Sequence, residues 1–231
     1  MKTLLITGAS KGIGLETARL FIDNGYRAIN ISRTAPPDDR IESHPIDLVS
    51  SEADARLAEV LGTVEAGEIT LVHNAASMIN DSARDADTEA FRRVMDLNVT
   101  APQILNQAVI PKMGAGSSIL YIGSTLSEKA VANTFSYVTS KHAIIGMMRA
   151  TCQDFAGSGI HTACICPGFT DTEMLRIHVG EDEAVLDSIA GLCTFNRLIA
   201  PAEIASTIYF AATNPVINGS VIHANLGQVE S

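Results

Sequence analysis

The sequence contains no tryptophan, and its few tyrosines and phenylalanines amount to only 5% of 231 residues. Hydrophobic residues nevertheless make up 46% of the chain, so its core must be built mainly from aliphatic side chains. Strands of a parallel sheet, which are buried on both faces, have this aliphatic character. The sequence also lacks any Cys-x-x-Cys pair and any cysteine–histidine cluster with zinc-ligand spacing. We therefore expect no metal site and only free thiols.

Basic residues are scarce, because 16 lysines and arginines stand against 26 aspartates and glutamates, for a net charge of −10. Binding to a polyanion requires clustered cations that neutralise its phosphates, so the balance argues against nucleic acid and anionic membranes as partners. No apolar run approaches the ~18 residues of a membrane span. The apolar run at the N-terminus stops at Thr7-Gly8, too early for a signal peptide. We expect a cytoplasmic protein.

Short apolar runs alternate along the chain with longer segments of helical periodicity. Repeated alternation of this kind implies right-handed crossovers and a mostly parallel sheet covered on both faces. We therefore predict a doubly wound α/β sheet of about seven strands flanked by helices. No linker, repeat or low-complexity tract divides the chain, so residues 1–231 form one predicted domain. The predicted strands are Thr3–Thr7, Arg27–Ser32, His44–Ile46, Ile69–His73, Ser118–Ile122, Ile160–Cys166 and Ser220–Ala224, and the predicted helices are Ile13–Asn24, Glu52–Leu61, Thr88–Met113, Tyr137–Ala156 and Pro201–Ala212.

The first predicted strand runs into a glycine-rich turn, Thr7-Gly8-Ala9-Ser10-Lys11-Gly12-Ile13-Gly14. Its three glycines permit a tight turn, close approach of a phosphate to the backbone, and close packing of helix on strand. The following helix N-terminus offers unpaired N–H groups and a partial positive charge to a pyrophosphate. A glycine-rich turn without a ligand is the alternative. A P-loop is excluded, because no Gly-Lys-Ser/Thr follows at the required spacing.

This turn resembles the cofactor signature Thr-Gly-x-x-x-Gly-x-Gly of the short-chain dehydrogenases/reductases, in their compact single-domain branch. The resemblance runs from Thr3 to about Gly227 and implies a Rossmann-type fold that binds a nicotinamide dinucleotide. His73-Asn74-Ala75-Ala76 is similar to the family's Asn-Asn-Ala-Gly, which supports the adenosine side. The segment from Pro167 to Met174 resembles the Pro-Gly-x-x-x-Thr-x-Met stretch beneath the nicotinamide. The cofactor contacts that these segments imply come from Asn74, Ala75, Pro167, Gly168, Thr170 and Thr172.

The end of the second predicted strand bears on the choice between NAD(H) and NADP(H). A carboxylate at this place binds the adenosine ribose of NAD and repels a 2′-phosphate. The chain instead has Ser32 followed by Arg33, and Lys11 lies in the glycine turn. Two cations favour a 2′-phosphate through charge-assisted hydrogen bonds, so NADP(H) is favoured over NAD(H). Two merely solvated surface cations are the alternative. Asp47 and Leu48 resemble the pair that contacts adenine in the family.

Tyr137 and Lys141 lie four residues apart on a predicted helix, and therefore on one face. An ammonium close to a phenol favours its ionised form, which suits a tyrosine to general acid/base chemistry near neutral pH. Alone, such a pair is usually a surface pair. Ser124 follows a predicted strand, however, and would project into the crevice where parallel sheets bind ligands. With Asn98, these residues resemble the family's Asn-Ser-Tyr-Lys set in order and spacing.

By this resemblance the chain transfers a hydride between NADP(H) and a carbonyl or alcohol substrate. Tyr137 would exchange a proton with the substrate oxygen, to which Ser124 would donate a hydrogen bond. Lys141 would hold the nicotinamide ribose and favour the ionised phenol. Asn98 is expected at a helix distortion, with a water that links Lys141 to solvent. Because family sensors typically lose the tyrosine or the lysine, a non-catalytic NADP(H)-binding sensor or regulator is the alternative function.

Substrate choice is expected to reside in residues 126–135 and in a lid over residues 169–197. The substrate is a small molecule, and a sugar, steroid, pteridine, quinone or 3-oxoacyl thioester all stay open. Family members commonly associate through the catalytic helix and the helix before it, so the resemblance implies a homodimer or homotetramer.

Overall fold

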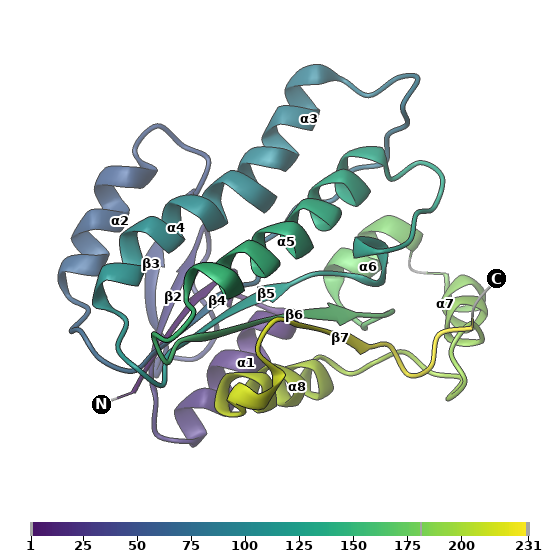
Figure 1. The fold of residues 1–231 in the computed structure, drawn as a ribbon. Helices are drawn as coiled ribbons and strands as arrows, with labels where there is room; N and C mark the ends of the chain where they lie inside the picture. Colours follow the sequence, from purple (N-terminus) through teal and green to yellow (C-terminus); the bar gives the residue numbers. More distant parts are fainter. Residues whose placement is uncertain (1, 181, 230–231) are drawn as a thin grey trace.

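The computed structural model describes residues 2–180 and 182–229, so residues 1, 181 and 230–231 of the predicted domain lie outside the described residues. Its parallel strands form one sheet in the order β3-β2-β1-β4-β5-β6-β7 (Figure 1). The chain starts in the middle of the sheet, adds β2 and β3 on one side, and then crosses over to build the other side. This is the predicted doubly wound, Rossmann-like arrangement. The strands are β1 Thr3–Thr7, β2 Arg27–Ser32, β3 Glu42–Pro45, β4 Ile69–His73, β5 Ser118–Ile122, β6 His161–Pro167 and β7 Ser220–Ala224.

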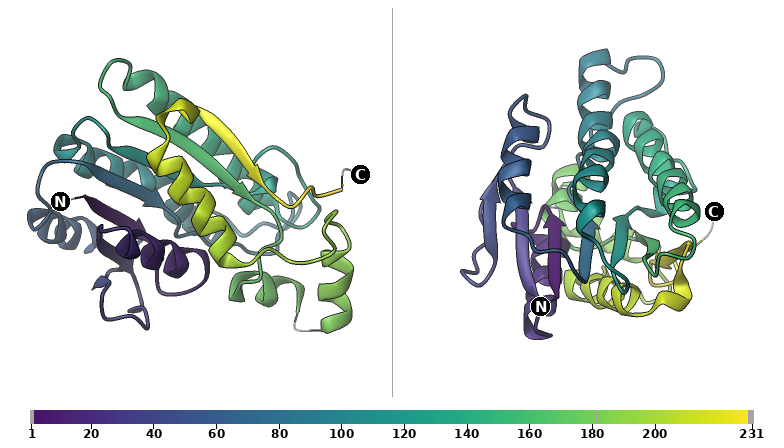
Figure 2. Two further views of the ribbon diagram at one scale, coloured as in Figure 1. Left: turned by 90° about the horizontal axis from the view of Figure 1, so that it is seen from below. Right: turned by 60° about the vertical axis from the view of Figure 1, so that its left-hand side comes forward.

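Helices cover both faces of the sheet (Figures 1 and 2). Leu5 of β1 faces the core on one side, whereas Leu4 and Ile6 face the core on the other, as the alternation of side chains along a strand requires. Among the described residues, no helix combines the length and apolar character needed to cross a membrane. One face carries α2 (Ala53–Gly62), α4 (Ala101–Val109) and α5 (Phe135–Asp154), and the other carries α1 (Gly12–Asp23) and α8 (Pro201–Thr213).

The strand predictions are confirmed apart from shifts at the ends, the largest at β3, which begins at Glu42 and not at His44. The helix predicted over Thr88–Met113 is confirmed as a continuous helical segment to Lys112, but it is not a regular α-helix throughout. It divides into α3 (Thr88–Met95), a π-helical turn η1 (Asp96–Thr100), α4, and a 3₁₀ turn η2 (Ile110–Lys112). Pro102 explains the first break, because its ring has no N–H and clashes with the carbonyl four residues earlier, that of Asn98. The backbone widens there, and the N–H of Ala101 bonds to the carbonyl of Asp96.

The stretch from Gly168 to Leu198, which has mixed signals in the sequence, is an excursion from the sheet that carries two short helices. Its base is closed by a parallel bridge between Thr170 and Ile199. The C-terminal segment packs against the end of this excursion. There the Thr194 N–H donates to the Gly227 carbonyl (3.2 Å), and the backbones of Cys193 and Gln228 form an antiparallel β-bridge. The two helices are α6 (Glu173–Val179) and α7 (Glu183–Ala190).

A chain of buried polar side chains crosses the core beside β4 and β5. His73 Nε2 donates to Asn106 Oδ1 (2.8 Å), and Asn106 Nδ2 donates to the hydroxyl of Tyr121 (2.7 Å). That hydroxyl lies 3.0 Å from Thr151 Oγ1. The other ring nitrogen of His73, Nδ1, is buried and has no hydrogen-bond partner among the described residues. Burial lowers the pKa of His73 to about 4, so the ring is neutral in the folded protein.

This histidine should make the protein less stable at mildly acidic pH. The unfolded chain binds a proton at an ordinary histidine pKa of about 6.5, whereas the folded chain does so only at about 4. Between these values the unfolded state binds more protons, so the free energy of unfolding falls as the pH falls.

We expect the wild type to lose up to about 3 kcal/mol more than His73→Asn between about pH 7 and about pH 4, measured by chemical denaturation. Comparison with the variant removes the shared contribution of the carboxylates. Parallel pH profiles of the two proteins would contradict this account.

Candidate active site

The glycine turn lies between β1 and α1 and is shaped by conformations that side chains rarely adopt. Gly8 and Gly12 have φ angles of +72° and +55°. A Cβ on Gly14 would lie 2.3 Å from the Gly8 carbonyl oxygen and 2.6 Å from Nδ2 of Asn74. All three glycines are therefore needed for the backbone to fold this tightly against β4. The turn also contains Ser10, Lys11 and Ile13, which are exposed or half-buried.

Asn74, the first residue after β4, fastens this turn to the sheet. Its Nδ2 donates to the carbonyls of Thr7 (3.0 Å) and Gly8 (2.9 Å). In return, Thr7 Oγ1 accepts the backbone N–H groups of Asn74 (3.1 Å) and Ala75 (3.0 Å). The structure thus brings together two segments that the sequence predicts as separate cofactor contacts.

Asn30 of β2 is a functional candidate that the sequence analysis missed. Its Oδ1 accepts the Ala9 N–H of the glycine turn (2.8 Å), and its Nδ2 donates to Ser32 Oγ (2.8 Å). Ser32 Oγ in turn donates to the Thr34 carbonyl (2.7 Å), so this hydroxyl is already used within the protein. The available signal was an amide side chain between Ile29 and Ile31 in a predicted strand.

Arg33, next along the chain, is exposed and forms no ion pair with any residue that the structure describes. The predicted adenine contacts, Asp47 and Leu48, lie in the loop after β3, the strand next to β2. Asp47 is exposed and accepts the N–H of Val49 (3.3 Å), and half-buried Leu48 packs against the core. No hydrogen bond among the described residues joins Asp47 or Leu48 to the glycine turn.

Tyr137 and Lys141 lie in the first and second turns of α5 and are 8% and 4% exposed. Lys141 Nζ donates to the carbonyl of Ile122, the last residue of β5 (2.7 Å). The same atom lies 5.5 Å from the centroid of the Tyr137 ring. A lysine so deeply buried is held in one orientation, with its ammonium between the end of β5 and the tyrosine.

Ser124 lies two residues after the end of β5 and caps the 3₁₀ turn η3 (Thr125–Ser127), which packs against α5. Its Oγ accepts the N–H of Leu126 (3.1 Å), while its own N–H donates to Ser127 Oγ (3.0 Å). Among the described residues, nothing accepts the proton of the Ser124 hydroxyl, so this group is available to donate to another molecule. Behind it, a Cβ on Gly123 would lie 2.8 Å from the sulfurs of both Cys164 and Cys166, which are buried on the same side of β6.

Asn98 lies in the π-helical turn and connects it to two other segments. Its Oδ1 accepts the Ser77 N–H (2.8 Å), and its Nδ2 donates to the Ser77 carbonyl and to Ser140 Oγ (both 2.9 Å). Ser140 Oγ donates to the Tyr137 carbonyl (2.8 Å). Asn98 therefore joins the loop after β4 to the turn of α5 that carries the tyrosine.

Asp81, also missed from the sequence, holds the start of α5. Its carboxylate accepts the Ser136 N–H (3.0 Å) and bonds the Ser136 hydroxyl. Its backbone pairs with Asn133 and Phe135. An aspartate can be recognised from the sequence as a helix cap only when it immediately precedes the helix. Asp81 comes from the loop after β4, so the contact depends on the tertiary fold.

The segment after β6 reaches the glycine turn from the opposite side. Pro167 ends β6, Gly168 lies tightly against the backbone of Asn225, and Thr170 Oγ1 donates to the Gly168 carbonyl (3.1 Å). Thr172 caps α6 by accepting the Leu175 N–H (3.3 Å). A Cβ on Gly12 would lie 3.3 Å from Thr172 Cγ2. The start of α6 and the glycine turn are therefore in contact.

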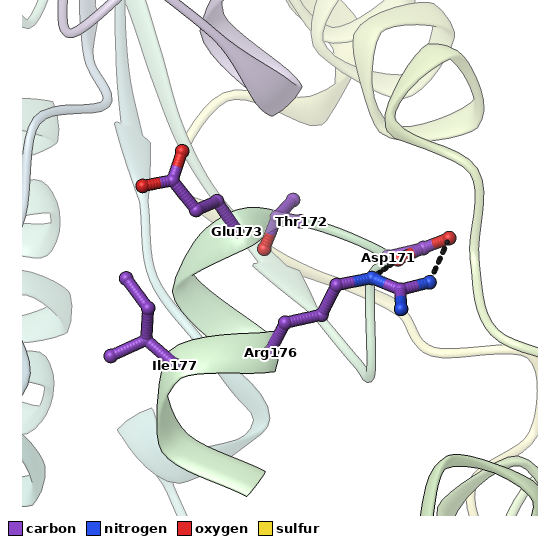
Figure 3. Close-up of a pocket in the computed structure, with 5 residues that line it drawn as sticks. All are labelled: Asp171, Thr172, Glu173, Arg176 and Ile177. Atoms are coloured by element: carbon purple, nitrogen blue, oxygen red, sulfur yellow. Dashed lines mark hydrogen bonds and ion pairs between the residues drawn. The ribbon is translucent and has the colours of Figure 1, made fainter. Parts of the chain in front are cut away.

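A cavity of about 400 Å³ lies beside α6 (Figure 3). Glu173 and Ile177 project from one side of the helix, while Arg176 on the other side pairs with Asp171 (2.8 Å). The lining belongs to the segment predicted as a lid and includes neither Ser124 nor Tyr137. In the part of the chain that the structure describes, no cluster of three or more histidines, cysteines or carboxylates could hold a metal ion.

The model of one protein family, described as short chain dehydrogenase, matches residues 2–182 of the chain. The chain belongs to this family. A short-chain dehydrogenase is an oxidoreductase that uses a nicotinamide cofactor on the alcohol or carbonyl group of a small molecule.

The alignments with known relatives cover most of this short-chain dehydrogenase. It is 30% identical to 2-keto-3-deoxy-L-fuconate dehydrogenase of Xanthomonas campestris, over 92% of this chain and 74% of the relative. It is 28% identical to zerumbone synthase of Zingiber zerumbet, over 97% and 96%. The crystal structure of a short chain dehydrogenase family protein from Francisella tularensis has a TM-score of 0.90 at 26% identity, covering 98% of both chains.

Gly14→Ala tests the glycine turn. The new methyl group would lie 2.3 Å from the Gly8 oxygen, so the turn must open, and affinity for a nicotinamide dinucleotide should fall at least about tenfold. Fluorescence titration with the reduced cofactor measures the loss. Gly62→Ala at the end of α2 is the matched control, because nothing lies within 4 Å of its new methyl group. Equal affinity of both variants would refute the tight packing of this turn.

Proposed function

We propose that this short-chain dehydrogenase transfers a hydride between NADP(H) and a carbonyl or alcohol, with Tyr137 as general acid/base. The observation that carries the proposal is the placement of Lys141. Its nearly buried ammonium is held by the Ile122 carbonyl at 2.7 Å and lies 5.5 Å from the Tyr137 ring. A cation fixed beside the ring stabilises the negative charge that develops on the phenol oxygen as the proton is transferred.

We assign each of the four candidate residues a role from its contacts and from the family. Tyr137 donates a proton to the carbonyl oxygen in reduction and accepts it in oxidation. Ser124, whose hydroxyl proton has no acceptor among the described residues, donates a hydrogen bond to the same oxygen and stabilises its developing charge. Lys141 stabilises the tyrosinate and binds the ribose hydroxyls. Asn98 is a positioning residue, because it acts through Ser140 on the backbone of Tyr137.

The chain fits a nicotinamide dinucleotide at the glycine turn, where a Cβ on any of the three glycines would clash or require a strained backbone. A bound nicotinamide supplies or accepts the hydride. Gly8, Ser10, Gly12, Ile13 and Gly14 would cradle the pyrophosphate at the start of α1. The other proposed contacts are Asp47, Leu48, Asn74 and Ala75 toward the adenosine, and Pro167, Gly168, Thr170 and Thr172 toward the nicotinamide.

NADP(H) is proposed over NAD(H) because β2 ends without a carboxylate. The residue there is Ser32, an uncharged side chain whose hydroxyl is hydrogen-bonded to Asn30 and to the Thr34 carbonyl. Arg33 follows, exposed and without an ion pair to any described residue, and can form two parallel hydrogen bonds with a phosphate. Lys11 supplies a second cation from the glycine turn.

We further propose that the chain is one catalytic domain in which residues 169–197 form a lid over the substrate. The bridge between Thr170 and Ile199 gives this segment a fixed base, as a moving lid requires. The free cysteines are consistent with a cytoplasmic location. A homodimer or homotetramer through α4 and α5 is proposed from the family.

Tyr137→Phe tests the acid/base. Loss of the phenol oxygen should lower turnover with a carbonyl substrate at least about 100-fold, because proton transfer then has no side-chain donor. The affinity for NADPH, measured by fluorescence titration, should change less than about twofold. Tyr209→Phe, the same change on half-buried Tyr209 of α8, should retain wild-type turnover. Substantial turnover by Tyr137→Phe would exclude this residue as the proton donor.

Arg33→Gln tests the cofactor preference. Loss of a charge-assisted pair should weaken NADPH binding about tenfold or more and leave NADH binding nearly unchanged. The exposed Arg56 of α2 provides the control Arg56→Gln, which should alter neither affinity. Equal weakening of both cofactors by Arg33→Gln would count against a 2′-phosphate site at this position.

A further inference from the structure

The glycine turn and α6 are joined by an ion pair that the proposed function does not use. Lys11 Nζ lies 2.6 Å from Glu173 Oε2. Lys11 is the N-cap of α1, and Glu173 is the first residue of α6. Their neighbours in the sequence also lie close together, since a Cβ on Gly12 would lie 3.3 Å from the side-chain atom Cγ2 of Thr172. The pair therefore connects the start of α6 to the glycine turn that would hold the dinucleotide.

Arg176, the nearby cation on α6, pairs with Asp171, and Glu173 pairs with Lys11. Figure 3 shows Glu173 on one side of α6 and the Asp171–Arg176 pair on the other. The Lys11 and Glu173 side chains are 61% and 57% exposed, so solvent screens their attraction and the pair is easily exchanged. A lysine ammonium is a point charge on a flexible stem that can turn to a stronger anion within reach.

We propose that Glu173 competes with the 2′-phosphate of the cofactor for Lys11, and thereby limits how strongly the site prefers NADP(H) to NAD(H). A phosphate monoester carries about −1.5 to −2 charges near neutral pH, against a single charge on the carboxylate, so the phosphate displaces Glu173. Because Glu173 lies 2.6 Å from Lys11, a phosphate bound to Lys11 would come near the displaced carboxylate and be repelled by it. NAD(H) has no 2′-phosphate, so Glu173 does not compete with it for Lys11. The inference rests on the proposed NADP(H) preference and assigns a specificity-determining role to a residue of α6.

Glu173→Gln separates this role from a purely structural one. The change removes the charge but keeps the size, and NADPH affinity should rise about threefold to tenfold, while NADH affinity should rise less than about twofold. Fluorescence titration of both cofactors gives the two dissociation constants. Glu183→Gln, at the exposed start of α7, removes a charge of the same sign from the same segment and should change neither affinity.

The double variant with Lys11→Met provides the decisive comparison. Without Lys11 there is nothing to compete for, so adding Glu173→Gln should then change NADPH affinity much less than it does in the wild type. An unchanged NADPH affinity in Glu173→Gln, or an equal gain with and without Lys11, overturns the inference. Failure of the proposed cofactor preference is distinguishable, because it shows as wild-type protein that binds NADH as tightly as NADPH.

Discussion

The side-chain amide of Asn74 is the contact on which the cofactor half of the structure depends. The tight turn after β1 exposes carbonyls of Thr7 and Gly8 that no strand can satisfy, and unpaired buried carbonyls are costly. The side-chain nitrogen of Asn74, the residue after β4, donates to both carbonyls, at 3.0 and 2.9 Å. The turn is thereby held so close to β4 that Gly14 has no room for a methyl group. The direction of α1 follows from this constraint.

The catalytic half is held by similar contacts between the ends of strands and the helices that follow them. Ile122 at the end of β5 bonds Lys141, and the loop after β4 supplies two more contacts, from Ser77 to Asn98 and from Asp81 to Ser136. Since β1, β4 and β5 are adjacent and parallel, these loops meet at one edge of the sheet. A short-chain dehydrogenase thus places its proposed cofactor and proton-transfer residues together through the order of its strands.

The sequence predicts those features that are local. Strands are visible as short apolar runs, and the glycine turn and the Tyr137–Lys141 spacing each lie within a few residues. Contacts between distant segments were missed, among them Asn30 with Ala9 and Asp81 with Ser136, because each joins residues that only the fold brings together. The distortion at Asn98 was expected from the family resemblance alone and not from the periodicity of the sequence. Helical periodicity continues through it, and only the position of Pro102 indicates that the backbone must widen.

Isotope transfer tests most directly whether these residues form one centre for hydride transfer. NADPH labelled with deuterium at either face of C4 would be incubated with the protein and a panel of small carbonyl compounds, and the alcohol products examined by mass spectrometry. Our account predicts deuterium on the former carbonyl carbon from one of the two labelled forms. Tight NADPH binding with no labelled alcohol from any compound would contradict it and favour a protein that binds the cofactor without turnover.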